Sequence, residues 1–238
     1  MDMCSEPLRT TLKRFCIVVV FGVAFGYIEA AVVVYLRTIF HPDGFTFPLT
    51  NFGVSSLWRP LLFTEVGREA ATIVLILTAA WLSGQGLQQR FAYFLTIFAV
   101  WDIFYYVWLK ALLNWPASIM DWDILFLIPI TWASPVLAPV LISVTLLLFA
   151  GIILYRGCCA SPLKVTAMEW VIFAVAGLIV GASFCIAGLH IARPDFQSHF
   201  YWPLFAVGYM LAIVVFLRCL LRSKLRSGKH PQSPTTSH

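Results

Sequence analysis

Long apolar runs divide this sequence, and each run is long enough to cross a lipid bilayer as a helix. A helix needs about 20 mostly apolar residues to span the hydrocarbon core. The runs predict six spans, which are Phe15–Leu36, about Pro60–Ser83, Phe91–Leu113, about Trp132–Tyr155, Thr166–His190 and Tyr201–Leu221. Charged residues make up only 11% of the chain, against about 25% in a soluble domain, which excludes a water-soluble globule. We therefore expect an all-α fold, a polytopic transmembrane helical bundle.

The positions of lysine and arginine predict how this bundle is oriented. Six spans leave both termini on one side of the membrane, and eleven of the 16 Lys and Arg residues fall on that side. Because cytoplasmic loops are enriched in Lys and Arg, we expect this side to be cytoplasmic, in a multi-pass protein of a bacterial-type cell inner membrane. Contact with the anionic headgroups of membrane lipids accounts for the formal net charge of +5, so no nucleic acid partner is expected.

The domain organisation follows from this topology. We expect residues 1–14 to form a cytoplasmic N-terminus, residues 15–222 a single six-span transmembrane domain, and residues 223–238 a disordered basic cytoplasmic tail. The apolar segment Ile124–Thr131 precedes the fourth span, and prolines interrupt this region. Since proline inside a helix removes a backbone donor and kinks the helix, we expect Ile124–Thr131 to be a re-entrant or interfacial piece on the outer side.

Several ionisable residues lie inside the predicted spans. Each such residue costs roughly 2.5–3.5 kcal/mol to insert and usually faces the interior of the bundle. The second span must include some of its charges, because Ala70–Ser83 alone would cover roughly 21 Å of a hydrocarbon core about 30 Å thick. Asp102 is the deepest of these residues, about 18 Å from the outer end of the third span at Asn114.

The charged residues of the spans fall into stripes, because residues three and four apart share one face of a helix. The stripes are Glu65, Arg68 and Glu69 in the second span, and Asp102, Tyr106 and Lys110 in the third. Together with Glu29 of the first span, these residues form the candidate site for a ligand or a proton.

Paired glycines are expected to bring two of the spans close to their neighbours. Gly22 and Gly26 align with Glu29 on the first span, and Gly177 and Gly181 repeat the spacing on the fifth. A G-x-x-x-G surface lets two helix backbones approach closely. We expect this contact to hold Glu29 against a neighbouring helix.

Acids outnumber bases among the candidate residues. Four carboxylates accompany only two cations, Arg68 and Lys110. In a low dielectric, either some carboxylates carry a proton or a bound cation completes the set. The leading hypothesis is a site, open to the extracytoplasmic side, that binds or translocates a proton, a cation or a small solute. The aromatic residues around Asp102 are either packing residues or the walls of a cage for an organic cation; they are Trp101, Tyr105, Tyr106 and Trp108.

Two alternatives stay open. An intramembrane enzyme could use a carboxylate as general acid or base on a lipid-like substrate, although the chain carries no nucleophile elbow, P-loop or dinucleotide-binding motif. A structural or assembly subunit of a membrane complex, or a homo-oligomer, would instead use the charges as an ion-pair network. That network would join Arg68 to Glu65 or Glu69, Lys110 to Asp102, and Arg37 to Glu29.

No cofactor motif is present, and the histidines on the outer side give no reason to expect a metal site. His41, His190 and His199 lack the i, i+4 spacing of a helical ligand pair, and the chain has no H-E-x-x-H sequence. Imidazole ligands would suit zinc, copper or iron, but these histidines lack the spacing of a ligand pair. We therefore expect neither a metal nor a cofactor.

Overall fold

The computed structural model describes residues 5–41, 44–49, 58–160 and 162–227. Its helices are α1 (Ser5–Phe40), α2 (Trp58–Ser83), α3 (Leu87–Leu113), α4 (Leu137–Cys159), α5 (Ala167–Gly188) and α6 (Trp202–Ser227), with a short 3-10 helix η1 (Phe196–His199). In this part of the chain, α1, α3, α4, α5 and α6 are each long and apolar enough to cross a membrane. The structure therefore supports a helical bundle of the membrane-protein type.

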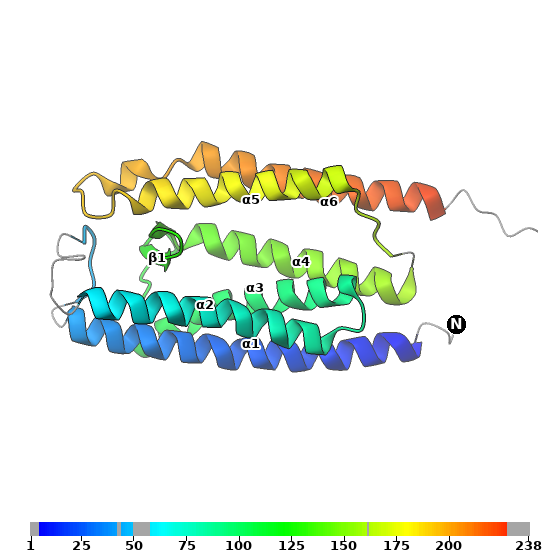
Figure 1. The fold of residues 1–238 in the computed structure, drawn as a ribbon, viewed down its shortest axis with the longest axis horizontal. Helices are drawn as coiled ribbons and strands as arrows, with labels where there is room; N and C mark the ends of the chain where they lie inside the picture. The colour runs from blue at the N-terminus through cyan, green and yellow to red at the C-terminus, as the bar shows by residue number, and fades with distance from the viewer. Residues whose placement is uncertain (1–4, 42–43, 50–57, 161, 228–238) are drawn as a thin grey trace, which may run out of the picture.

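The six long helices run roughly along one direction and form two layers (Figure 1). In the larger layer, α3 packs against α1, α2 and α4. The second layer is the pair of α5 and α6, which contact each other extensively. The start of α1 and the end of α6 lie at the same end of the bundle (Figure 1), which we call the terminal end.

Glycines bring α1 and α3 close together. A Cβ atom on Gly22 would lie 2.9 Å from Cβ of Val100, and one on Gly26 would lie 3.0 Å from the carbonyl oxygen of Trp101. The expected close packing at Gly22 and Gly26 is therefore present. Because the two backbones touch here, the next turn of α1, which carries Glu29, stays beside the neighbouring helices.

The segment before α4 forms a β-hairpin, which was not predicted from the sequence. Strand β1 (Trp122–Phe126) pairs antiparallel with β2 (Trp132–Pro135). The prediction that the fourth span begins at Trp132 is therefore wrong, since α4 begins at Leu137. A helix starting at Trp132 would have had both Pro135 and Pro139 inside it, whereas a start at Leu137 leaves only Pro139, in the first turn, where proline is tolerated.

The hairpin lies between the two layers, at the end of the bundle opposite to the terminal end (Figure 1). We call this the hairpin end. Strand β2 contacts α5, and a Cβ atom on Gly181 would lie 3.4 Å from the Trp132 ring. A Cβ atom on Gly188 would overlap the carbonyl oxygen of Thr131. Gly181 and Gly188 thus let the hairpin pack closely against α5. A Cβ atom on Gly177 would have no neighbouring atom within 4 Å, so the expected packing role does not hold for Gly177.

Candidate functional site

A cavity of about 320 Å³ lies at the hairpin end of the bundle. It is bordered by α1, α2, α3, the hairpin, α4 and α5. Six of the seven candidate site residues line it, namely Glu29, Glu65, Arg68, Glu69, Asp102 and Tyr106. The structure does not bring the seventh, Lys110, to the cavity. Lys110 is exposed, and its Nζ donates to the carbonyl oxygens of Asn114, at 3.3 Å, and Pro116, at 3.0 Å.

Arg68 joins α1 to α2. Its Nε donates to Oε2 of Glu65 at 2.8 Å, and its Nη1 donates to Oε1 of Glu29. The side chains of Glu65 and Glu29 retain only 9% and 12% of their exposure. A single guanidinium therefore neutralises one of two nearly buried carboxylates, and the predicted pairing of Glu29 with Arg37 is wrong.

Glu69 and Asp102 are held by neutral hydrogen-bond donors. The backbone N–H of Leu127, in the loop of the hairpin, donates to Oε2 of Glu69 at 2.9 Å. The Ser143 hydroxyl of α4 donates to Oδ2 of Asp102 at 2.8 Å. Within the described part of the chain, neither carboxylate forms an ion pair. The predicted pair of Asp102 with Lys110 is therefore not formed.

A further acid, Asp123 of β1, lines the cavity and was not among the candidates found in the sequence. Its Oδ1 accepts a hydrogen bond from Nη2 of Arg37 at 3.2 Å, and its Oδ2 accepts one from the Tyr105 hydroxyl at 3.2 Å. Asp123 is 2% exposed and Arg37 is 8% exposed. Burial raises the pKa of the Asp123 carboxyl to about 6, and the Arg37 guanidinium limits this rise. Its position next to the apolar run that begins at Ile124 was the only sequence signal for this role.

Arg37 is also covered by aromatic rings. Its guanidinium carbon lies 4.1 Å from the ring centroid of Phe45 and 3.8 Å from that of Trp115. A guanidinium over an aromatic face is attracted by the ring quadrupole. Phe45, which follows α1, and Trp115, which follows α3, therefore both pack on Arg37, the ion-pair partner of Asp123.

Apolar and aromatic side chains make up most of the remaining wall of the cavity. The aromatic residues among them are Phe40, Phe45, Phe98, Trp101, Tyr105, Tyr106, Phe126, Trp132 and Phe184. The indole Nε1 atoms of Trp101 and Trp132 are buried and have no hydrogen-bond partner among the described residues. Buried indole N–H groups usually find a partner, so these two donors are exceptions within the described part of the chain.

The described histidines and acids do not form a metal-binding cluster. No group of three or more His, Cys, Asp or Glu residues in the described ranges is arranged to hold a metal ion. His190 and His199 stack on each other with ring centroids 3.9 Å apart, and Nε2 of His199 lies 3.2 Å from Oδ2 of Asp195. These groups do not line the cavity.

The cavity thus combines two ion-paired groups, two carboxylates with no cationic partner among the described residues, and a wall of aliphatic and aromatic side chains. Such a surface can hold a positively charged or hydrogen-bonding group inside an apolar shell. Comparison of the chain with family models, with curated proteins and with solved structures finds no match.

Proposed function

We propose that this membrane protein binds, and moves across the bilayer, a proton-carrying or cationic small solute at the cavity of the hairpin end. The bound charge would interact directly with Glu69 and Asp102. The residues around Arg68 and Arg37 would shape the cavity and set its electrostatic potential. The cavity would open to the extracytoplasmic side of a cell inner membrane.

The charge balance of the cavity is the observation that carries this proposal. Two arginines and five carboxylates line it among the described side chains; the carboxylates are Glu29, Glu65, Glu69, Asp102 and Asp123. Full ionisation would leave three negative charges without a cationic partner in a low dielectric, which is strongly unfavourable. Protons or a cationic ligand would remove this imbalance, and Glu69 and Asp102 are the acids with no ion pair of their own.

A six-span topology with both termini in the cytoplasm is part of the same proposal. The common position of the start of α1 and the end of α6 (Figure 1) agrees with an even number of crossings. Helix α2 would be the sixth crossing, with its charged residues Glu65, Arg68 and Glu69 turned to the cavity rather than to lipid. Positive residues concentrated at the terminal end then favour the cytoplasm for that end.

A structural role is the second candidate, and the ion pairs support it. Arg68 connects α1 with α2, and Arg37 connects α1 with the hairpin. A scaffold subunit of a membrane complex would need only these links. It would not depend on Glu69 and Asp102 being able to carry a charge, so the two candidates predict different results for the same variants.

We expect Asp102→Asn and Glu69→Gln each to slow cation movement about tenfold, equivalent to about 1.4 kcal/mol. Both amides keep the shape of the carboxyl group but cannot neutralise a cation or carry an exchangeable acidic proton. The measurement is the flux of protons, followed with a pH-sensitive dye, and of radiolabelled tetramethylammonium into proteoliposomes that contain the purified protein.

Asp195→Asn is the matched control, because Asp195 is an exposed acid outside the cavity. Its fluxes should equal those of the wild-type protein. If the wild-type protein moves neither probe faster than empty liposomes, or if both cavity variants fold and match the wild type, the proposal is wrong and the structural role is favoured.

A further inference from the structure

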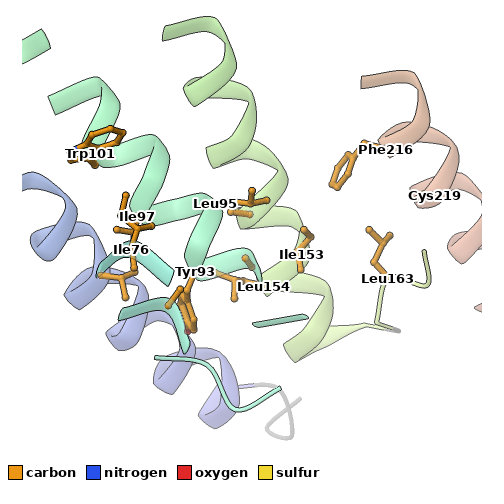
Figure 2. Close-up of a cluster of buried hydrophobic side chains, with 14 of the residues drawn as sticks. Ile76, Tyr93, Leu95, Ile97, Trp101, Ile153, Leu154, Leu163, Phe216 and Cys219 are labelled. Atoms are coloured by element: carbon orange, nitrogen blue, oxygen red, sulfur yellow. The ribbon is translucent and has the colours of Figure 1, made fainter. Parts of the chain in front are cut away.

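A second, larger cleft of about 780 Å³ lies between the two helix layers, toward the terminal end. Its walls come from the start of α3, one face of α4, the first half of α5 and the middle of α6. In Figure 2, Leu95 and Ile153 lie across from Leu163 and Phe216, and all four residues line the cleft. The lining is mostly apolar, with Gln88, Thr145, Lys164 and Tyr209 as its polar members.

Two contacts tie α4 to α6 along this cleft. The rings of Phe149 and Phe216 stack with centroids 3.7 Å apart, and the hydroxyl oxygens of Thr145 and Tyr209 lie 2.6 Å apart. All four residues line the cleft. The cleft is therefore a feature of the packed bundle, held by specific contacts between the layers.

The cleft and the cavity meet in the middle of the bundle. Ile142 of α4 and Gly177 and Val180 of α5 line both of them. A Cβ atom on Gly177 would have no atom within 4 Å, so the junction is open on the α5 side. The residue after Ile142 is Ser143, the hydrogen-bond partner of Asp102. The apolar cleft thus ends next to Asp102, which forms no ion pair with any described residue.

We infer that the ligand is an amphipathic organic cation, whose positive head sits at Asp102 and whose apolar body lies in the cleft. This inference rests on the proposed function and adds the class of substrate. The acid surplus of the cavity complements a positive head, and the aromatic residues there, Trp101 among them, can stabilise an organic cation through their ring faces. The apolar lining and the volume of the cleft suit a hydrophobic body, since ligand sites commonly measure about 300–1,000 Å³.

The test compares two probes of equal charge on the full-length protein in nanodiscs. Tetraphenylphosphonium carries a large apolar body, whereas tetramethylammonium carries almost none. We expect the protein to bind tetraphenylphosphonium at least tenfold more tightly than tetramethylammonium, after subtraction of binding to empty nanodiscs. Asp102→Asn should weaken the binding of both probes about tenfold, because both heads would meet the same carboxylate.

Gly177→Phe tests the path through the junction. The ring would fill the space that joins cleft and cavity, so tetraphenylphosphonium binding should fall about tenfold, while tetramethylammonium binding should fall much less. Gly151→Phe is the matched control, because Gly151 on α4 is exposed, has no atom within 4 Å of a Cβ position and lines neither space. It should leave the binding of both probes unchanged.

The outcomes separate this inference from the proposed function. If tetramethylammonium binds in an Asp102-dependent way while tetraphenylphosphonium binds no better, the cationic site stands and the amphipathic ligand is rejected. Unchanged tetraphenylphosphonium binding in a folded Gly177→Phe variant would also reject it, and would assign the cleft to membrane lipid. If neither probe depends on Asp102, the proposed function itself fails.

Discussion

Replacing Arg68 with methionine is expected to destabilise the protein by about 3–5 kcal/mol, the usual result of removing one partner from a buried ion pair. The guanidinium of Arg68 donates to both Glu65 and Glu29. Without it, two nearly buried carboxylates on neighbouring helices face each other with no cation between them. Methionine keeps an apolar stem close in shape to that of arginine, so the loss reports mainly on the missing guanidinium.

The measurement for Arg68→Met is the apparent Tm of the purified protein in detergent, followed by the loss of the monodisperse fraction on heating. A loss of about 3–5 kcal/mol corresponds to a fall of roughly 6–20 °C for a chain of this length. Lys110→Met is the matched control: Lys110 is exposed, and within the described ranges its Nζ bonds to two carbonyl oxygens, so the Tm of this variant should change little.

A second substitution tests the cause of the Arg68→Met effect. If the cost comes from the unpaired carboxylates, the double variant Arg68→Met with Glu29→Gln should recover part of the lost Tm, because one of the two negative charges is gone. A Tm for Arg68→Met within 2–3 °C of the wild type, about 1 kcal/mol, would show that the Arg68 network does not hold α1 to α2.

Replacing Gly188 with alanine is expected to cost about 3 kcal/mol, at the upper end of ordinary overpacking, or roughly 6–12 °C in Tm. The added methyl group would overlap the carbonyl oxygen of Thr131. That atom belongs to the backbone, so no side-chain rotation can make room. Either α5 or the whole hairpin has to move.

Gly188→Ala should also disturb the cavity, since the hairpin carries Asp123 and the Leu127 N–H that binds Glu69. We therefore expect weaker tetramethylammonium binding together with the lower Tm. Gly177→Ala is the matched control on the same helix, because a Cβ atom there meets open space; its Tm should equal that of the wild type. Equal Tm values for Gly188→Ala and Gly177→Ala would contradict the close packing of the hairpin against α5.

Sequence patterns predicted the helices well because they depend on local chemistry. Runs of apolar residues mark segments that are stable in lipid, and each predicted span overlaps one long helix of the structure. The fourth helix differs at its start, since it begins at Leu137, after Pro135. Residues three and four apart share a face in any helix, so the bond between Glu65 and Arg68 also followed from spacing alone.

Hydrogen bonds and ion pairs between different helices and strands could not be predicted from sequence spacing. The structural alternative paired Asp102 with Lys110 on its own helix face, but Asp102 bonds to Ser143 of α4. The same alternative paired Arg37 with Glu29, but Arg37 bonds to Asp123, 86 residues away. Contacts between elements depend on how the helices are arranged and on the path of the hairpin. The spacing of residues along one helix does not determine either of these.

The amino-acid sequence by itself determined that this is a helical membrane protein with more acids than bases in its apolar segments, because hydrophobicity and charge are properties of each residue. Only the tertiary structure decided that six of the candidate residues border one cavity, that Asp123 joins them and that an apolar cleft reaches it at Gly177. The physical reason is that cavities and ion pairs arise where separate elements pack, and the pairing of elements minimises the free energy of the whole bundle rather than of any one segment.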